Sequence, residues 1–338
     1  MPLYNADIYL GESIESILNQ TFRDFELIII YDNPSDEILE ILLAYQQNDS
    51  RIRLFTQKRQ GLIASLNQGC SFSKGEYILR MDADDFCVQD RIEKQVTFME
   101  NHPEVGICGS FIHCVDKNNK IVYDLKFPLH DKEIKFHMLF GNCIAHPSVI
   151  MRQKIIKELN FYTNNYLHAE DYDLWSRASS ITQLANLPDF LVSYRIHGEN
   201  VSILNFEDKD KNSIKLRYAL INDLFGYKLP EEPIINLMSY HREFNAITPD
   251  QISAIAKLIY AIYQRYISIH VLTPSEFQEV TNITGFQLLS LSISSIKIYP
   301  WMSLKIFIKA LKLNILTTFY LSKVMISMLC RKPHTLVE

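Results

Sequence analysis

The segment Gly75-Glu76-Tyr77-Ile78-Leu79-Arg80-Met81-Asp82-Ala83-Asp84-Asp85 joins a short apolar stretch to a dense acidic turn. Residues 77–81 predict a buried strand, and three carboxylates follow it within four positions. Carboxylates this close repel one another unless a cation lies between them. Open α/β sheets bind ligands beyond the carboxyl ends of their strands. The segment therefore indicates either a metal-dependent nucleotide site or a solvated acidic turn.

The first two thirds of the chain alternate strand and helix patterns. Apolar runs predict strands buried on both faces, and apolar residues spaced i, i+3, i+4 predict helices. Strands are expected at residues 25–30, 52–56, 77–81, 146–151 and 190–196, and helices at residues 7–20, 36–47, 62–72, 91–101 and 169–179. Residues 105–115 and 120–123 are interpreted as a β-rich insertion. The alternation predicts an α/β fold whose parallel or mixed sheet is covered by helices.

The pattern changes after about residue 204, so we place a domain boundary between residues 1–204 and 205–338. Helices are expected at residues 211–225, 248–269 and 303–328. From Gly285 onward the only acid is Glu338, while seven Lys and Arg lie among large apolar residues. These cations interrupt every window long enough to cross a membrane. A basic amphipathic helix on an anionic membrane surface is therefore favoured over helices packed on the first domain.

Composition narrows the class of protein. The 338 residues are 47% hydrophobic and 22% charged, as in a globular protein of one or two domains. The net charge of -5 argues against a nucleic-acid partner. Six scattered cysteines form no Cys-x-x-Cys pair, which argues against zinc or thioredoxin-like chemistry. No signal peptide precedes the first motif, so a reducing cytosol is the expected compartment.

Several short motifs follow one another in a characteristic order. They are Leu3–Ala6, Ser16–Ile29, Asn67–Gly69, Gly75–Ile78, Met81–Asp85, His146–Ser148, Glu170–Trp175 and Tyr194–Gly198. Their number, order and spacing resemble family-2 glycosyltransferases of the bacterial cell-surface polysaccharide type, which make lipopolysaccharide or capsule. The resemblance covers about residues 2–202. It implies the GT-A fold, a Rossmann-like nucleotide-sugar-binding domain, here followed by an α-helical C-terminal region.

The resemblance implies a binding site for a nucleoside-diphosphate sugar, with a UDP-sugar favoured. Tyr4 would stack its ring on the base, as aromatic faces commonly do. Asp32 would accept a hydrogen bond from the base. The alternatives are a core tyrosine for Tyr4 and a helix N-cap for Asp32, although Ser35 or Asp36 could serve as that cap instead.

The acidic turn would bind the rest of the donor. Of Asp82, Asp84 and Asp85, one would hold the ribose and another a Mn²⁺ or Mg²⁺ ion bridging the diphosphate, because hard cations prefer oxygen ligands. The sequence does not say which carboxylate does which. Arg80 would contact phosphate or, as we favour, balance these acids. His197 would join the metal or the diphosphate, unless it is structural.

The resemblance makes Asp171 the catalytic base of an inverting transfer, with Glu170 beside it on the acceptor side. A helix N-terminus lowers the pKa of a carboxyl group, whereas neighbouring acids raise it, and the sequence leaves this balance open. His146 would shape the acceptor side or be a core histidine. Trp175 would stack on a sugar or, as we favour, fill the core.

Two departures from the family pattern stand out. Family members usually begin with an apolar strand of about six residues, whereas Pro2 and Leu3 directly follow the first residue here. The first core strand is therefore expected to be missing, which would leave backbone groups on its neighbours unpaired. In the second departure, Tyr31 replaces the first of two adjacent acids and Pro34 stiffens the loop, while Asp32 is kept.

The leading hypothesis is a metal-dependent hexosyltransferase at the cytoplasmic face of the membrane. It would transfer a sugar from a nucleoside-diphosphate sugar to a lipid-linked or polysaccharide acceptor. The first core strand that is expected to be missing motivates the alternative of a truncated, inactive nucleotide-sugar-binding remnant. A two-carboxylate glycoside hydrolase is disfavoured, because it does not explain acids at a strand end beside a nucleotide-type sheet.

Overall fold

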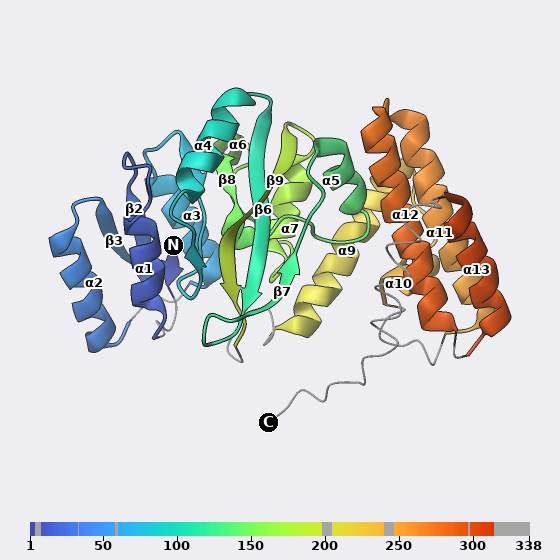
Figure 1. Cartoon of the computed structure of the whole chain (residues 1–338), viewed down its shortest axis with the longest axis horizontal. Coiled ribbons are helices and arrows are strands. Elements are labelled where there is room, and N and C mark those ends of the chain that lie inside the picture. Colours follow the sequence, from blue (N-terminus) through green and yellow to red (C-terminus); the bar gives the residue numbers. More distant parts are fainter. Residues whose placement is uncertain are drawn as a thin grey trace. The chain divides into compact units, whose positions relative to one another are not determined.

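A computed structural model describes residues 1–3, 8–32, 34–57, 60–197, 205–239, 247–296 and 298–313 (Figure 1). For Asp32 and Ser239 only the backbone is described. The chain divides into two compact units, Met1–Leu216 and Arg217–Glu338. The division falls inside helix α9 (Phe206–Phe225). The boundary that we placed at residue 204 stays a proposal.

A three-stranded parallel sheet opens the first unit, in the order β1-β2-β3. Its elements are β1 (Pro2–Leu3), α1 (Leu10–Leu18), β2 (Leu27–Asp32), α2 (Asp36–Asn48), β3 (Ile52–Gln57) and α3 (Leu62–Phe72). The apolar run at the start of β2 is buried, as expected for a strand covered on both faces. Helix α2 begins where the Ser35 side chain accepts a hydrogen bond from the Ile38 N–H.

A short strand, β1, stands at the position of the first core strand. Pro2–Leu3 pairs with residues 30–31 of β2. The Met1 amino group prolongs this ladder by donating to the Ile28 carbonyl at 2.8 Å. The expectation that the strand is missing is therefore wrong for these residues. In the described structure β2 and β4 belong to separate sheets, and a cavity of about 700 Å³ lies between them. Residues of both strands line it: Leu27, Ile28 and Ile30 from β2, and Tyr77, Ile78 and Leu79 from β4.

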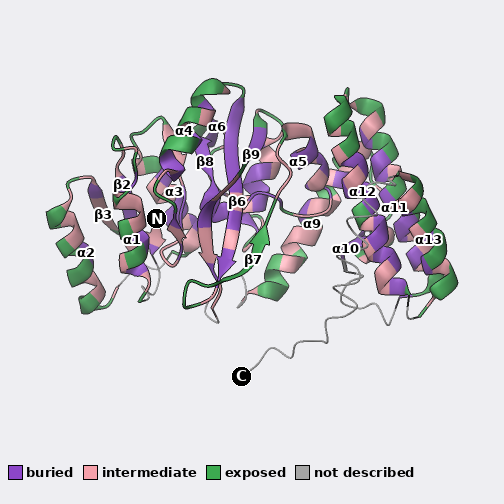
Figure 2. Ribbon diagram, viewed as in Figure 1, coloured by how far each residue is buried: buried purple, intermediate pink, exposed green. Residues whose placement is uncertain are grey.

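The second sheet of this unit is mixed, in the order β4-β8-β6-β9-β5, with β7 paired to β6. Its strands are β4 (Tyr77–Leu79), β5 (Phe86–Cys87), β6 (Val105–Val115), β7 (Ile121–Leu125), β8 (Ile150–Arg152) and β9 (Gln183–Arg195). Strands β6 and β9 run parallel, and the other pairs are antiparallel. The interpretation of residues 105–115 as an insertion is wrong, because β6 is a central buried strand (Figure 2).

Four helices accompany this sheet. They are α4 (Arg91–Asn101), α5 (Asp131–His137), α6 (Gln153–Glu158) and α7 (Glu170–Ala178). Helices α4 and α7 both contact β6 and β9. A short 3-10 helix, η1 (His146–Ser148), occupies the first half of the strand predicted at residues 146–151, and only its end forms β8. The acidic turn lies between β4 and β5 and therefore joins the two edges of this sheet.

The second unit is helical over its described residues. Besides the end of α9 it contains α10 (Glu231–Ser239), α11 (Pro249–Ile269), α12 (Pro274–Ser295) and α13 (Pro300–Leu313). Helices α11 and α12 begin with capping boxes at Thr248 and Thr273. The helix predicted to reach residue 328 is described only to Leu313. Within the described ranges, no helix has the length and apolar character needed to span a bilayer.

Candidate active site

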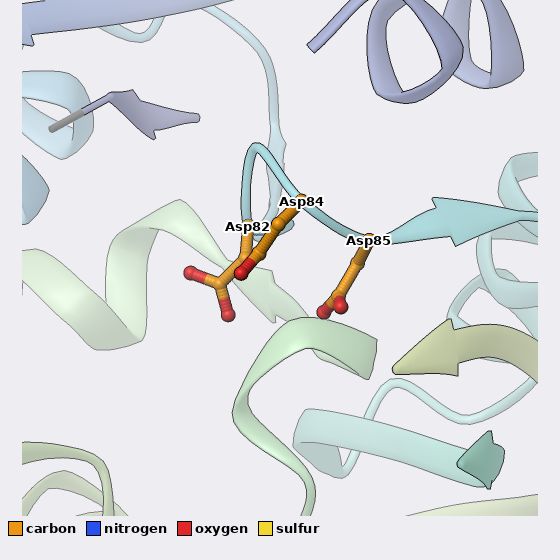
Figure 3. Close-up of side chains that lie close together, drawn as sticks. All are labelled: Asp82, Asp84 and Asp85. Carbon is orange, nitrogen blue, oxygen red and sulfur yellow. The ribbon is translucent and has the colours of Figure 1, made fainter. Parts of the chain in front are cut away.

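Asp82, Asp84 and Asp85 point to the same side of the loop after β4 (Figure 3). One oxygen from each carboxylate lies within 4.8 Å of the others. Asp85 is completely buried. Burial, followed by the charges of Asp82 and Asp84, raises the pKa of Asp85 well above its ordinary value. The acidic turn is therefore a cluster of closely spaced carboxyl groups, one of them fully buried, rather than a fully solvated turn.

This turn fits a divalent cation. Asp85 Oδ1 accepts the backbone N–H of Arg195 at 2.9 Å. The buried Oδ2 of Asp85 has no hydrogen-bond partner among the described residues. A buried carboxylate oxygen without a partner is costly. A hard cation held by carboxylate oxygens would remove that cost, and Mg²⁺ and Mn²⁺ prefer such ligands.

Arg80 and His197 both lie at the acidic turn. The Arg80 guanidinium is buried and donates to Asp82 Oδ2. This ion pair agrees with the charge-balancing role that we favoured for Arg80. The ring Nε2 of His197 lies 2.9 Å from Asp84 Oδ2. The structure thus brings two predicted residues, separated by more than a hundred positions, to neighbouring carboxylates of the same acidic turn.

A second acidic site stands at the start of α7. Asp171 Oδ2 accepts a hydrogen bond from Asn142 Nδ2 at 2.8 Å. Burial raises the pKa of Asp171 above its ordinary value. Glu170 is 7% exposed, and burial followed by the Asp171 charge raises the pKa of Glu170 to about 7. For both carboxyl groups the influences that raise the pKa, burial above all, therefore outweigh the charges and hydrogen bonds that lower it.

One cation acts on both acidic sites. The buried Arg80 charge lowers the pKa of Glu170 and Asp171 as well as that of Asp82, although burial is the larger influence on each. The charge of Lys209 also lowers the pKa of both Glu170 and Asp171, and at Asp171 it acts more strongly than Arg80. The two carboxylate sites therefore belong to one electrostatic environment.

The remaining acid of the first turn of α7 is structural. Asp173 Oδ2 accepts from Arg177 Nε at 2.9 Å and from Thr163 Oγ1 at 3.0 Å. These bonds tie α7 to the preceding loop. Asp171 is thus distinguished from Asp173 by its contacts, although both are acids near the same helix end.

The two aromatic residues expected on the acceptor side are buried. His146 Nε2 lies 2.9 Å from the Tyr162 hydroxyl, and burial lowers the pKa of His146 well below its ordinary value. Trp175 is fully buried, with its ring edge-on to His146 at 5.9 Å. A buried ring cannot stack on a sugar, so that role for Trp175 is wrong and the favoured core role fits. His146 is held as a neutral core histidine, and its acceptor-side role stays a prediction.

Two predicted residues cannot be placed in the site. Tyr4 lies outside the described residues, and of Asp32 only the backbone, at the end of β2, is described. Because Ser35 caps α2, the alternative of a helix N-cap for Asp32 is not needed. Sequence reasoning missed Asn142, which no motif signals. It also assigned no role to Arg195, although this residue stands within a quoted motif.

Comparison with known proteins supports the fold and the family. The family model for glycosyl transferase family 2 matches residues 1–159. An uncharacterized glycosyltransferase of Haemophilus influenzae is 33% identical over 276 residues, covering 79% of this chain and 84% of that protein. The O-antigen biosynthesis glycosyltransferase WbnJ of Escherichia coli is 36% identical over 205 residues, covering 59% of this chain and 79% of that protein.

Among solved structures, S. aureus TarS 1-349 in complex with UDP-GlcNAc has a similar fold. Its TM-score is 0.55 at 16% identity, with 91% of this chain and 88% of that chain covered. The α/β architecture with a mixed sheet is thus that of GT-A glycosyltransferases, as predicted. On the motifs, the fold and the relatives together, the chain belongs to glycosyltransferase family 2.

Proposed function

We propose that this chain is an inverting, metal-dependent glycosyltransferase that uses a UDP-sugar to build a cell-surface polysaccharide. The observation that carries this proposal is the presence of two carboxylate sites, the acidic turn Asp82–Asp85 and the pair Glu170 and Asp171, which both feel the charge of the buried Arg80. One site has the ligands for a metal–diphosphate complex, and the other offers a base. The complex of TarS with UDP-GlcNAc supports the choice of donor. The O-antigen role given to WbnJ supports the class of product.

At the donor end, Asp84 and Asp85 would hold Mn²⁺ or Mg²⁺, with His197 beside Asp84. When bound, the cation stabilises negative charge on the departing nucleoside diphosphate. Asp82 is paired with Arg80 and would face the ribose. This division follows from the contacts, because Asp85 has an unpartnered oxygen whereas Asp82 already has a cationic partner.

At the acceptor end, Asp171 would act as the general base. Asn142 holds Oδ2 of its carboxylate. The base takes the proton of the acceptor hydroxyl while the hydroxyl oxygen attacks the anomeric carbon. The bond from that carbon to the diphosphate oxygen breaks, and the configuration inverts. The raised pKa of Asp171 suits this role, because a base is most effective when its pKa approaches the working pH.

Substitution of each site separates donor binding from chemistry. We expect Asp171→Asn to lower transfer about 10²–10⁴-fold, the usual contribution of a general base, while calorimetry still detects UDP binding in the presence of Mn²⁺. Asp84→Asn should weaken Mn²⁺-dependent UDP binding as well as transfer. Asp124→Asn, a change at an exposed strand β7 residue, is the control and should leave both intact. Metal-independent transfer that survives both site substitutions contradicts the proposal.

The cavity beside β1 favours a second candidate, an inactive nucleotide-sugar-binding remnant. Unpaired strand edges at the cavity would loosen the sheet that carries the acidic turn. This candidate predicts that the unmodified chain binds UDP with Mn²⁺ but shows no turnover with any donor and acceptor. Measurable sugar transfer or donor hydrolysis by the unmodified chain excludes it.

Helix α13 supports attachment to an anionic membrane surface, where a lipid-linked acceptor would lie. Three lysines and three large apolar residues share one exposed face of this helix: Trp301, Leu304, Lys305, Ile308, Lys309 and Lys312. Trp301 is 79% exposed. Apolar side chains beside lysines are typical of helices that lie in the headgroup layer of anionic membranes. The proposed location is therefore the cytoplasmic face of the membrane.

A further inference from the structure

The acidic turn is held from outside by Arg195, the last residue of β9. Its backbone N–H donates to Asp85 Oδ1 at 2.9 Å, and its Nε donates to the Asp84 carbonyl at 2.9 Å. From the other side, the Ser13 hydroxyl contacts the carbonyls of Ala83, at 2.7 Å, and of Asp85. The backbone of the turn is therefore fixed at successive residues.

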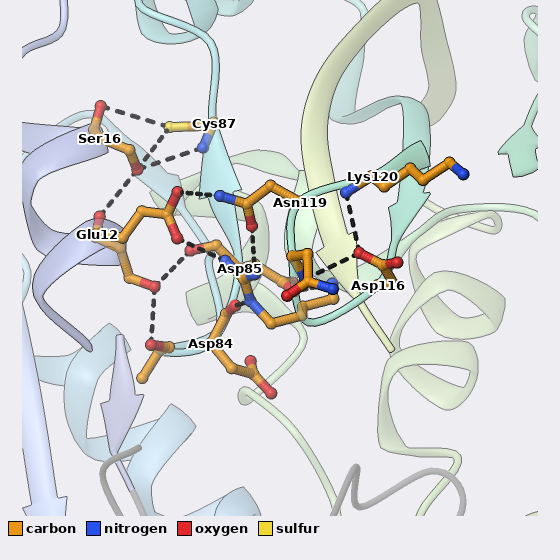
Figure 4. Close-up of polar contacts among 12 residues, drawn as sticks. Glu12, Ser16, Asp84, Asp85, Cys87, Asp116, Asn119 and Lys120 are labelled. Carbon is orange, nitrogen blue, oxygen red and sulfur yellow. Dashed lines mark hydrogen bonds and ion pairs between the residues drawn. The ribbon is translucent and has the colours of Figure 1, made fainter. Parts of the chain in front are cut away.

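The far end of the Arg195 guanidinium belongs to a closed triangle of side chains. Nη2 donates to Glu12 Oε2 at 2.7 Å, and Nη1 donates to Asn119 Oδ1. Asn119 Nδ2 in turn donates to Glu12 Oε1 at 2.8 Å (Figure 4). The Tyr9 ring lies 3.9 Å from the guanidinium carbon. Arg195 is 1% exposed. Burial and the hydrogen bonds of this triangle therefore leave its guanidinium little freedom to rotate.

Asn119 is presented to this triangle by a tight turn between β6 and β7. Its φ of 63° is left-handed, a conformation that asparagine tolerates. Its N–H donates to the Asp116 carbonyl at 3.0 Å. The Asp116 side chain accepts from the N–H groups of Asn118 and Lys120. The hydrogen bonds of the turn thus orient the Asn119 amide toward Glu12 and Arg195.

Within this triangle, one residue neutralises the Arg195 charge, and Arg195 itself positions the acidic turn. Glu12 matches the Arg195 charge, while the acidic turn receives a directed bond to the Asp84 carbonyl and a backbone N–H at Asp85. The carboxylates can thereby be oriented while their charges stay available to a cation. Groups that orient metal ligands in this way usually account for 10- to 100-fold in metal affinity.

We propose that Glu12, Asn119 and Arg195 form a positioning clamp that sets the angle at which Asp84 and Asp85 meet a divalent cation. The inference rests on the proposed function, since it assumes that the acidic turn binds the cation. The inference gives a positioning role to α1 and to the β6–β7 turn, although neither supplies a ligand to the cation. The clamp residues act through the turn and contact no reacting atom.

The test measures Mn²⁺ binding directly, by electron paramagnetic resonance of free Mn²⁺ in the presence of UDP. Asn119→Gly removes the amide but keeps the left-handed backbone, and Glu12→Gln removes the charge. Each should raise the Kd for Mn²⁺ about 10- to 100-fold. The Kd of the double variant should rise by less than the product of the two single increases, because both substitutions act through Arg195. Transfer at saturating Mn²⁺ should largely recover, which a general loss of folding would not allow.

Matched controls exist for both changes. Asn160→Gly replaces another left-handed asparagine, at the end of α6, and Glu15→Gln alters another α1 glutamate, one that bonds to Tyr45. Both controls should keep the Kd for Mn²⁺ within about twofold. If Asn119→Gly and Glu12→Gln lower only the melting temperature and leave the Kd unchanged, the clamp is overturned and the proposed function stands. If the unmodified chain with UDP binds no Mn²⁺, the clamp and the proposed function are both contradicted.

Discussion

At the scale of single residues, the adjacent carboxylates of Glu170 and Asp171 illustrate how environment decides chemistry. Both begin α7, where the helix dipole favours their ionised forms. Burial works in the opposite direction and raises the pKa of both. Asp171 additionally receives a hydrogen bond from Asn142, which orients it. The pair thus combines a positioned base with a neighbour that titrates near neutral pH.

Glu170→Gln is predicted to remove a pH-dependent loss of stability. The pKa of Glu170 rises from 4.5 to about 7 on folding, so the folded state keeps a proton that the unfolded state has lost between these values. The free energy of unfolding of the wild type therefore falls as pH rises through this window and levels off above it. From pH 4 to pH 8 the variant should gain on the order of 3 kcal/mol relative to the wild type.

Urea unfolding at pH 4, 6 and 8 measures this difference. Glu158→Gln, at the exposed end of α6, is the control and should shift stability by the same amount at every pH. Parallel pH profiles for the wild type and Glu170→Gln would show that Glu170 is not held protonated by the fold.

At the scale of elements, a cavity lies between β2 and β4 beside the two-residue strand β1. Strand β1 pairs with residues 30–31 of β2, and residues of both β2 and β4 line the cavity. Burial, followed by the Arg80 charge, lowers the pKa of the Met1 amino group to about 5. An extended segment in this cavity would lie beside the strand residues of both sheets.

Fusion of six strand-forming, mostly apolar residues, such as Thr-Val-Ile-Val-Val-Ile, in front of Met1 is predicted to stabilise the unit. The added strand would pair with the free edges of β2 and β4 and fill the cavity. Each kcal/mol gained should raise the melting temperature by about 2–4 °C in a unit of this size. Differential scanning calorimetry measures the shift, with a Ser-Gly hexapeptide fusion as control. Equal melting temperatures for the two fusions would contradict a strand-accepting cavity.

At the scale of the whole molecule, the two units carry different features. The first contains both carboxylate sites, whereas the second presents the lysine-bearing face of α13. The proposed division assigns sugar transfer to one unit and attachment to the other.

Lys305→Gln combined with Lys309→Gln is predicted to weaken binding to anionic vesicles. Each lysine near such a surface contributes about 1 kcal/mol, so the double variant should bind about 30-fold more weakly. Sedimentation with phosphatidylglycerol vesicles measures this partition, and phosphatidylcholine vesicles should bind little of either protein. Lys211→Gln with Lys215→Gln, two exposed lysines of α9, is the control. Unchanged sedimentation of the α13 variant would contradict attachment through this face.

Local patterns predicted local elements well. Helices α3 and α4 begin and end at the predicted residues, 62–72 and 91–101, because helical periodicity and hydrogen bonding lie within one segment. Strand β6 was misplaced as an insertion, since its partners β8 and β9 come much later in the chain. The position of a strand within a sheet depends on pairing between distant segments, which periodicity does not encode.

The sequence by itself determined the family, the alternation of strands and helices and the identity of the acidic residues, because motifs and periodicity are local. Only the tertiary structure decided that Arg195 meets Asp85 across 110 positions and that Trp175 is core. It also decided that the pKa of Asp171 is raised, because burial is the largest influence on this carboxyl group. Desolvation and hydrogen bonding depend on which distant segments surround a group, and that is established only when the chain has folded.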